Sequence, residues 1–165
     1  MDNLRTGTGW DIHPLVPVRK LVLGGVEVPF QRGLDGWSDA DVLTHAIMDA
    51  LLGAAALGDI GLHFPPGKDE YLNISSIALL QRVSALLGQE GWQVVNIDAT
   101  VIAEKPRLRE HIDAMRQNIA GAMGVKTGII SIKASTSNGL GDIGRGEGIA
   151  ALATALIRGV SNEDL

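Results

Sequence analysis

W92-Q-V-V-N-I-D-A-T-V-I102 and G128-I-I-S-I-K-A134 are two apolar runs rich in β-branched residues, and each predicts a strand. Residues 108–123 lie between them and have the pattern of a helix. A strand, a helix and a second strand in this order predict a βαβ crossover, which pairs the two strands in parallel within one sheet. This part of the chain therefore assigns the protein to the α/β class.

The flanking sequence adds a hairpin and three more predicted helices. K20-L-V-L-G-G-V-E-V-P-F30 predicts two short strands joined at a Gly-Gly turn. Residues 39–57, 74–88 and 148–157 predict helices, and the last is so apolar that we expect it to be buried on most sides. With no repeat or linker, the sequence predicts one compact domain over residues 1–165, with helices packed on a small mixed sheet.

The overall composition restricts the kinds of function. Hydrophobic residues make up 45% of the chain but aromatic residues only 4%, which favours tight helix–sheet packing and a large subunit interface. A net charge of −5 argues against nucleic acid as the main partner. Because there is no cysteine, any metal must be held by nitrogen and oxygen. No apolar run is long enough to span a membrane, so we expect a cytoplasmic protein, although a processed transit peptide would leave no trace.

One group of polar residues indicates a metal site. Side chains alternate along a strand, so Asp11 and His13 point to the same face. His45 lies on the predicted helix 39–57. Two imidazoles and one carboxylate suit Zn²⁺, and three protein ligands leave the fourth tetrahedral position free for water or substrate. The alternative is that Asp11 closes a turn and the histidines satisfy hydrogen bonds in the core.

The start of that helix carries further polar residues. Ser38 is the predicted N-cap, and Asp41 three residues later completes a capping box. Asp41, His45 and Asp49 share one stripe of the helix because they are four residues apart. Asp49, one turn after His45, is expected to orient its imidazole from behind.

Three loops are candidates for ligand binding, since α/β proteins place their sites at strand ends. A103-E-K-P-R-L108 brings two cations to the mouth of the next helix, or is an ordinary solvated turn. A134-S-T-S-N138 offers hydroxyl and backbone N–H groups to phosphate, or forms a simple Ser/Thr turn. G144-R-G-E-G148 is expected to open the last helix, with Glu147 facing its dipole, and could equally serve packing.

Several unusual motifs coincide in one order along the chain. They are D11-I-H13, G33-x-x-x-W-S-D-A-D-V-x-x-H45, D49-A-L-L-G-A-A-A-L-G-D-I-G61, F64-P, E104-K-P-R and G144-R-G-E-G-I-A150. In this the chain closely resembles the 2-C-methyl-D-erythritol 2,4-cyclodiphosphate synthase family. The resemblance implies an α/β homotrimer with active sites between subunits. It also implies a lyase of the non-mevalonate isoprenoid route, which cyclises 4-diphosphocytidyl-2-C-methyl-D-erythritol 2-phosphate and releases CMP.

The resemblance also implies roles for individual residues. Asp11, His13 and His45 would hold Zn²⁺, and Thr136 would lie nearest the reacting phosphorus. A Mg²⁺ or Mn²⁺ ion would bridge the substrate's diphosphate, and family members can enclose an isoprenoid diphosphate on the trimer axis, near Arg145 and Glu147. The implied substrate-binding residues are Asp11, Ile12, His13, Trp37, Ser38, Asp59, Ile60, Gly61, Phe64, Lys68, Ala103, Lys105, Pro106, Arg107, Ser135, Thr136, Ser137, Asn138, Asp142 and Arg145.

Some positions depart from the family pattern. Trp37 stands where a histidine is usual, so either its indole N–H or only its backbone N–H serves the phosphate. Asn138 replaces the usual glutamate, which removes a charged ligand of the second cation. Asp142 stands where an aromatic or apolar residue is commoner, and it either supplies the lost carboxylate or makes the axial cavity less favourable for a prenyl chain. The sequence of the flap, F64-P-P-G-K68, also differs from the F-P-D-T-D that is usual in the family.

Other functions remain alternatives at this point. Two histidines and a carboxylate also form the facial triad of non-haem Fe(II) oxygenases, but those sites usually lie in β-rich folds, whereas four helices are predicted here. A zinc phosphohydrolase needs a general base beside the metal, and the H-E-x-x-H motif is absent. A trimeric scaffold that binds isoprenoid diphosphate around a structural zinc is the non-enzymatic alternative.

Overall fold

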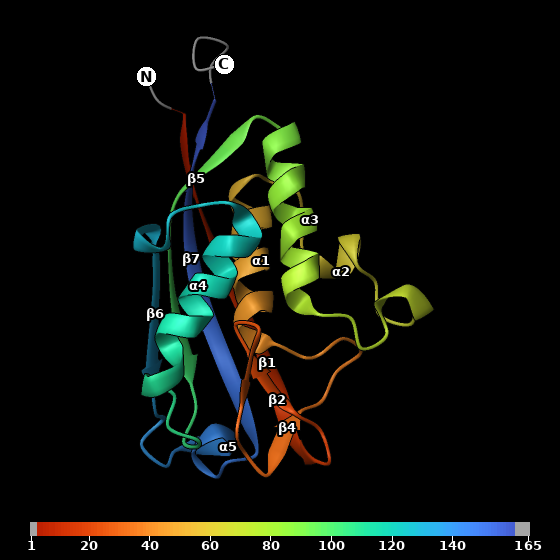
Figure 1. Cartoon of the computed structure of the whole chain (residues 1–165), viewed down its shortest axis with the longest axis vertical. Helices are drawn as coiled ribbons and strands as arrows, with labels where there is room; N and C mark the ends of the chain where they lie inside the picture. Colours follow the sequence, from red (N-terminus) through yellow and green to blue (C-terminus); the bar gives the residue numbers. More distant parts are fainter. Residues whose placement is uncertain (1–2, 161–165) are drawn as a thin grey trace.

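The computed structural model describes residues 3–160 (Figure 1). Its strands are β1 (Leu4–Pro17), β2 (Leu21–Leu23), β3 (Val26–Val28), β4 (Arg32–Leu34), β5 (Trp92–Ile102), β6 (Ile130–Ser135) and β7 (Gly148–Gly159). Its α-helices are α1 (Val42–Ala54), α2 (Ile60–His63), α3 (Ser76–Gln89), α4 (Ile112–Met123) and α5 (Gly141–Gly144). Short 3₁₀ turns cover Asp69–Tyr71, Arg109–His111 and Thr127–Ile129.

Five strands form one mixed sheet in the order β4-β1-β7-β5-β6. The predicted crossover is confirmed, because β5 and β6 pair in parallel on either side of α4, while the other neighbours in the sheet are antiparallel. The predicted hairpin is also confirmed as the separate pair β2-β3. The compact α/β fold with a mixed sheet is therefore as expected.

The predicted closing helix 148–157 is wrong, because this segment is β7, the central strand of the sheet. It pairs with β1 over its whole length on one side and with β5 on the other. Two neighbours satisfy its backbone N–H and C=O groups on both edges, so tertiary pairing overrides the helix propensity of its alanines. Ala151, Ala153 and Ala155 are buried, whereas Leu152 between them is 42% exposed. This alternation of burial is that of a strand, but the sequence does not show it because both faces of the segment are mainly apolar.

Other boundaries also differ from the sequence prediction. The N-cap of α1 is Asp41 rather than Ser38, and its carboxylate accepts the Thr44 N–H at 3.0 Å. The expected loop 59–70 contains the short helix α2, capped by Asp59. Glu147 does not open a helix; it lies in the turn before β7 and accepts a hydrogen bond from Arg145 Nε at 2.8 Å.

The helices α1, α3 and α4 cover one face of the sheet, and α1 packs directly on β1 and β7 (Figure 1). This approach requires glycine in β1. A Cβ atom at Gly9 would lie 1.9 Å from the Ala46 carbonyl oxygen, and one at Gly7 would lie 2.1 Å from that of Ala50. Because the helix backbone rests on the strand backbone, side chains of β1 and of the first turn of α1 are brought within reach of each other.

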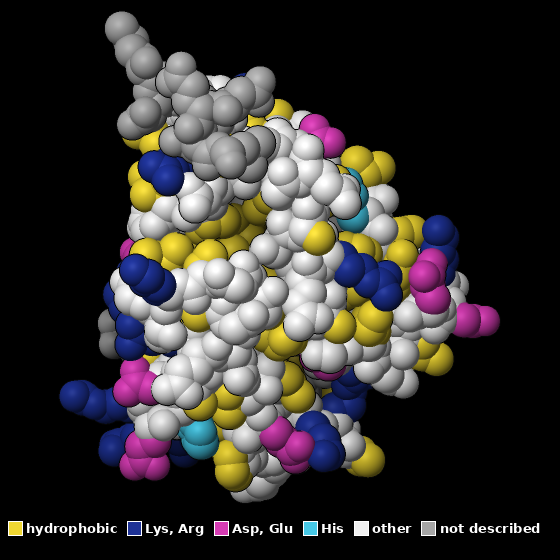
Figure 2. All heavy atoms as spheres, turned by 45° about the horizontal axis from the view of Figure 1, so that its top comes forward, with side chains coloured by type: hydrophobic (Ala, Val, Ile, Leu, Met, Phe, Trp, Pro, Cys, Tyr) yellow, Lys and Arg dark blue, Asp and Glu magenta, His cyan; other side chains and the backbone are white. Residues whose placement is uncertain are grey.

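The opposite face of the sheet carries exposed apolar side chains. Leu4, Trp10, Ile12 and Leu152 are between 42% and 54% exposed, and Trp10 lies directly across from Leu152 in the β1–β7 register. On the face drawn in Figure 2, acidic and basic side chains are interspersed and neither sign forms a continuous patch. Among residues 3–160, no helix combines the length and the apolar character that crossing a membrane requires.

Candidate metal centre and ligand cavities

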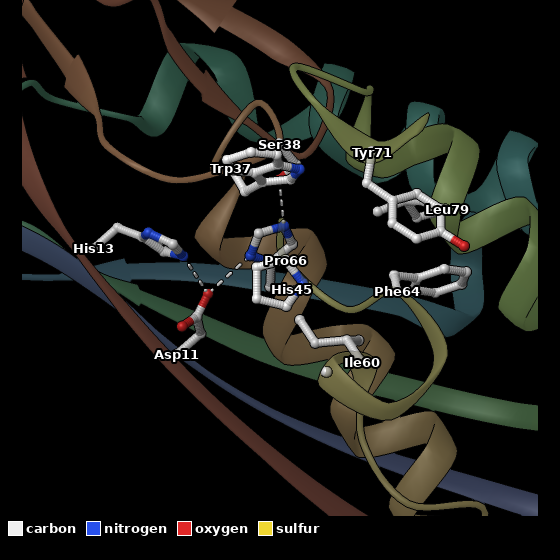
Figure 3. A pocket seen from close by; sticks show the side chains of 11 residues that line it. Asp11, His13, Trp37, Ser38, His45, Ile60, Phe64, Pro66, Tyr71 and Leu79 are labelled. Atoms are coloured by element: carbon white, nitrogen blue, oxygen red, sulfur yellow. Dashed lines mark hydrogen bonds and ion pairs between the residues drawn. The ribbon is translucent and has the colours of Figure 1, made fainter. Parts of the chain in front are cut away.

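Asp11 and His13 of β1 meet His45 of α1 on the helix-covered side of the sheet (Figure 3). One oxygen, Asp11 Oδ2, lies 2.9 Å from His13 Nε2 and 3.0 Å from His45 Nδ1. The alternation of side chains along β1 places the first two together, and the close packing of α1 on the strand brings in the third. The predicted convergence of these three side chains is therefore present in the structure.

The hydrogen bonds behind the two rings decide which nitrogens are free. His13 Nδ1 lies 2.5 Å from the Asp35 carbonyl oxygen, which can only accept, so this nitrogen donates and Nε2 is left for a ligand. Nε2 of His45 lies 2.9 Å from Ser76 Oγ and 3.2 Å from Ser38 Oγ, so its Nδ1 is the nitrogen that faces Asp11.

These donors fit a zinc ion. Two imidazole nitrogens and a carboxylate oxygen, one from each residue, lie within 4.8 Å of one another. Without a proton or cation between them, the nitrogen lone pairs would face the carboxylate oxygen at unfavourably short range. A shared cation removes that repulsion, and this set of donors with a fourth position open is typical of catalytic zinc.

The charges of the three groups are strongly coupled. Burial acts to raise the pKa of Asp11, but hydrogen bonds and charge interactions with His13 and His45 outweigh it and hold that pKa well below its usual range. Burial acts against protonation of His13, yet the hydrogen bond and charge of Asp11 raise its pKa above the ordinary value. Asp11 is thus an anion at any ordinary pH and attracts a cation into the centre.

A cavity of about 260 Å³ opens beside the three ligands. Beyond them its walls are largely apolar (Figure 3). The lining residues are Asp11, His13, Trp37, Ser38, His45, Ile60, Gly61, Phe64, Pro66, Tyr71 and Leu79. The structure therefore brings the predicted Trp37–Ser38 loop, the Ile60–Gly61 turn and the Phe64 flap to the metal centre.

The indole N–H of Trp37 bonds to the flap. Its Nε1 donates to the Lys68 carbonyl oxygen at 2.9 Å, which ties the flap to the loop before α1. The loop itself is held by Arg19, which donates to the carbonyl oxygens of Gly36 at 3.0 Å and Ser38 at 2.8 Å. Trp37 therefore joins the flap to the loop before α1.

A second cavity lies where β5 and β6 end. It is lined by Ala103, Glu104, Pro106, Arg107, Leu108, Arg109, Ala134, Ser135 and Thr136. The two predicted loops after these strands thus meet, as parallel strands require. This cavity and the one at the metal centre have no lining residue in common.

Glu104 connects these two loops, which the sequence reasoning missed. Its Oε1 accepts hydrogen bonds from Ser137 N at 2.9 Å, Ser137 Oγ at 3.1 Å and Gly139 N at 3.0 Å. The Gly139 N–H bond is the main reason that the pKa of Glu104 is lowered. Asn138 stands between these two donors in the left-handed conformation with φ 54°. Because the contacts span more than 30 residues, no local sequence pattern indicates them.

Some predicted site residues lie elsewhere. Asp142 pairs through Oδ1 with Arg145 at α5, on the exposed surface of the chain. Arg145 and Lys105 line a third cavity with Arg32. Ile12 is 48% exposed, at the edge of a fourth cavity that includes His13 and Asp142.

The expectation that Asp49 orients His45 is not supported by its contacts. Asp49 Oδ1 accepts the Ile60 N–H at 2.8 Å, so this carboxylate holds the start of α2. The groups that do contact the outer nitrogen of His45 are Ser38 and Ser76, neither of which was predicted in this role. Tyr71 and Leu79 were likewise missed as cavity residues, because apolar positions near a helix start look the same whether they face a core or a ligand.

Comparisons with known proteins agree with this site. The YgbB family model matches residues 4–158. A curated relative from Dehalococcoides mccartyi strain 195, named 2-C-methyl-D-erythritol 2,4-cyclodiphosphate synthase, is 60% identical over 93% of this chain and 98% of its own length. A relative of the same name from Moorella thermoacetica is 56% identical over 93% of this chain and 94% of its own.

Solved structures give the same result. The bifunctional IspDF from Campylobacter jejuni matches with a TM-score of 0.94 and 37% identity, over 98% of this chain and 44% of that longer one. A CDP complex of IspF from Plasmodium falciparum matches with a TM-score of 0.84 and 29% identity, over 98% of this chain and 99% of that one. Since the family model spans residues 4–158 and the curated relatives match over nearly their whole length, the chain belongs to the YgbB family.

Proposed function

We propose that the protein is a 2-C-methyl-D-erythritol 2,4-cyclodiphosphate synthase of the non-mevalonate route to isoprenoid precursors. It converts 4-diphosphocytidyl-2-C-methyl-D-erythritol 2-phosphate to the cyclic diphosphate and CMP. The observation that carries the proposal is the convergence of Asp11, His13 and His45 beside a cavity, in a chain whose curated relatives bear that enzyme's name. The CDP complex of a similar structure supports a cytidine nucleotide as ligand.

The reaction needs no nucleophile from the protein. An oxygen of the substrate's own 2-phosphate forms a bond to the β-phosphorus, and the bond from that phosphorus to the oxygen shared with the α-phosphate breaks, so CMP leaves with that oxygen. Catalysis then consists of positioning and of neutralising charge. Asp11, His13 and His45 would hold Zn²⁺, which supplies a Lewis acid to the β-phosphate when bound.

The remaining predicted residues position the substrate around that centre. Ser38 and the backbone at Trp37 face the phosphate beside the metal ligands, and Asp59 with Gly61 takes the erythritol hydroxyls. The second cavity takes the cytidine and the diphosphate, with Thr136 nearest the reacting phosphorus. The proposed contacts are the cavity residues Ala103, Pro106, Arg107, Ser135 and Thr136, together with Lys105, Ser137 and Asn138 from the same two loops.

A homotrimer with active sites between subunits explains why the two cavities are separate in one chain. The metal centre of one copy then faces the nucleotide cavity of the next. The exposed apolar side chains of Trp10, Ile12 and Leu152 on the outer sheet face support this assembly, because such a face is normally covered. An isoprenoid diphosphate on the trimer axis near Arg145 is a further part of the proposal.

A Mg²⁺ or Mn²⁺ ion is the proposed second cation; when bound it would neutralise charge on the diphosphate and so help CMP leave. Asn138 offers this ion a neutral oxygen where the family usually offers a carboxylate. Most of the ion's ligands are therefore expected to be phosphate oxygens and water.

Product analysis in ¹⁸O-labelled water tests the function. The purified protein, loaded with Zn²⁺ and supplied with Mg²⁺, should release CMP and the cyclic diphosphate with no label from solvent, because the oxygen in the new P–O bond comes from the substrate's own 2-phosphate. Label in the phosphate products would identify a zinc phosphohydrolase instead. A wild-type protein that binds zinc but turns over no substrate would favour the isoprenoid-binding scaffold. A His45→Ala variant, which lacks one of the three proposed zinc ligands, serves as the metal-free control.

A further inference from the structure

A buried hydroxyl and a half-buried carboxylate lie behind His45, on the side away from the metal centre. Ser76, at the start of α3, has no exposed surface, and its Oγ lies 2.9 Å from His45 Nε2. The same hydroxyl donates to Asp39 Oδ1 at 2.5 Å. Asp39 Oδ2 accepts the Ser76 N–H at 2.9 Å, so each of its oxygens contacts Ser76, and Oδ1 also accepts the Asp41 N–H at 3.2 Å.

The protons on this chain of hydrogen bonds can be assigned. A serine hydroxyl has one proton, and the carboxylate of Asp39 takes it because a carboxylate only accepts. Ser76 Oγ can therefore act toward His45 only as an acceptor, which requires a proton on His45 Nε2. The neutral ring then carries its lone pair on Nδ1, the nitrogen that faces Asp11 Oδ2.

We propose that Asp39 acts through Ser76 as a positioning residue, which fixes His45 in the tautomer and orientation that a metal ion at Nδ1 requires. This inference rests on the metal site of the proposed function and adds two residues to it. Ligating histidines commonly donate their second N–H to a carboxylate or a carbonyl, and here a serine is inserted between ring and carboxylate. His13 follows the same principle through the Asp35 carbonyl oxygen.

Ser38 provides an internal comparison. Its Oγ also lies near His45 Nε2, but at 3.2 Å, and it accepts the Ala40 N–H rather than donating to a carboxylate. Its hydroxyl proton is therefore not committed, so Ser38 does not dictate the tautomer. Both serines are buried, at 8% exposure for Ser38 and none for Ser76, so truncation to alanine removes a similar group from each.

The experiment measures zinc affinity by chelator competition in Ser76→Ala, Asp39→Asn, the double variant and Ser38→Ala. Ser76→Ala removes the hydroxyl but keeps the Ser76 N–H bond to Asp39, so the start of α3 retains its cap. Zinc affinity is expected to fall roughly 10- to 100-fold in Ser76→Ala. It is expected to change by less than about threefold in Ser38→Ala.

The double variant tests whether Asp39 acts through the serine. Asp39→Asn should weaken zinc binding in the wild-type background and add little in the Ser76→Ala background, since the link is already broken. In the zinc-loaded protein, ¹⁵N NMR should show the His45 proton on Nε2. Its exchange with water should be slow in the wild type and faster in Ser76→Ala, a signature that loss of a helix cap alone would not produce. Unfolding curves of each variant separate lost stability from lost affinity.

The outcomes that refute the proposal are distinct. Zinc affinity of Ser76→Ala within threefold of the wild type, equal losses in Ser76→Ala and Ser38→Ala, or additive losses in the double variant would each overturn it. A wild-type protein that binds no zinc would refute the metal site itself, and with it the positioning role of Asp39 and Ser76. A wild-type protein that binds zinc but does not cyclise the substrate would refute the proposed activity. The positioning role of Asp39 and Ser76 would still be supported by the zinc affinities of the variants.

Discussion

The contact between α1 and β1 offers the sharpest test of how the fold creates the metal centre. Gly9 lies under the helix, two residues before Asp11 in β1. In a Gly9→Ala variant the new Cβ would lie 1.9 Å from the Ala46 carbonyl oxygen and 2.7 Å from Ala50 N, and both are backbone atoms that cannot rotate away. The helix would have to move outward, and Ala46 is the neighbour of His45.

The size of the effect follows from these distances. Lengthening the shortest contact to 3.0 Å requires a shift of about 1 Å. Overpacking of this kind costs about 1–3 kcal/mol of the free energy of unfolding. Metal–ligand distances tolerate only about 0.2 Å, so the same shift should lower zinc affinity by at least about tenfold.

A matched control lies in the same helix. At Gly53 the nearest atom to an added Cβ is the Thr8 carbonyl oxygen at 4.0 Å, so Gly53→Ala meets no obstacle. Alanine is the better helix former, and this variant should gain about 0.5–1 kcal/mol. Urea unfolding and zinc titration of both variants test the reasoning. If Gly9→Ala were as stable as the wild type and bound zinc equally well, the close helix–strand packing could not be what assembles the site.

Three further predictions follow from single contacts. Trp37→Phe removes the indole donor to the Lys68 carbonyl, so hydrogen exchange of the flap amides should become about fivefold faster. Unchanged exchange, measured by mass spectrometry, would show that this hydrogen bond does not hold the flap. Asp41 is fully buried and accepts four hydrogen bonds, from the Gly24–Gly25 turn and from Thr44. Asp41→Asn should therefore lower the free energy of unfolding, measured with urea, by about 2–4 kcal/mol. An unchanged free energy would show that these hydrogen bonds do not stabilise the fold. In the metal-free protein, Asp11 has a lowered pKa and His13 a raised one. Their mutual stabilisation should be complete between pH 3.8 and 6.5, decline as the pH falls below that range, and decline again as it rises through the raised pKa of His13. Urea unfolding of the wild type and of His13→Gln across this pH series measures the effect. If Asp11 and His13 did not stabilise each other, the difference in unfolding free energy between the two proteins would not change with pH.

Local patterns predicted those elements whose faces are set by their own neighbours in sequence. Asp11 and His13 were placed on one face of a strand by alternation alone, and β5 and β6 were placed in parallel by the helix between them. The same approach failed at residues 148–157. An alanine-rich strand with apolar residues on both sides has no strong period, and only its two partner strands distinguish it from a buried helix.

The metal site was likewise predicted only in part from the sequence. The types of the metal donors could be named from the sequence, because nitrogen and oxygen ligands were the only kind available without cysteine. The groups behind them could not. Asp49 was a reasonable partner for His45 by helical spacing, yet Ser76, 31 residues away, takes that place because α3 packs against α1.

The amino-acid sequence by itself determined which donors exist, which strand carries two of them on one face, and that the fold contains a βαβ crossover. The tertiary structure decided which side chains stand behind each imidazole, where the flap is held, and which segment fills the middle of the sheet. The physical reason is range. Alternation and helical period arise from bonds between near neighbours, whereas a hydrogen bond between distant residues depends on how closely two backbones can approach, and here glycine in β1 sets that approach.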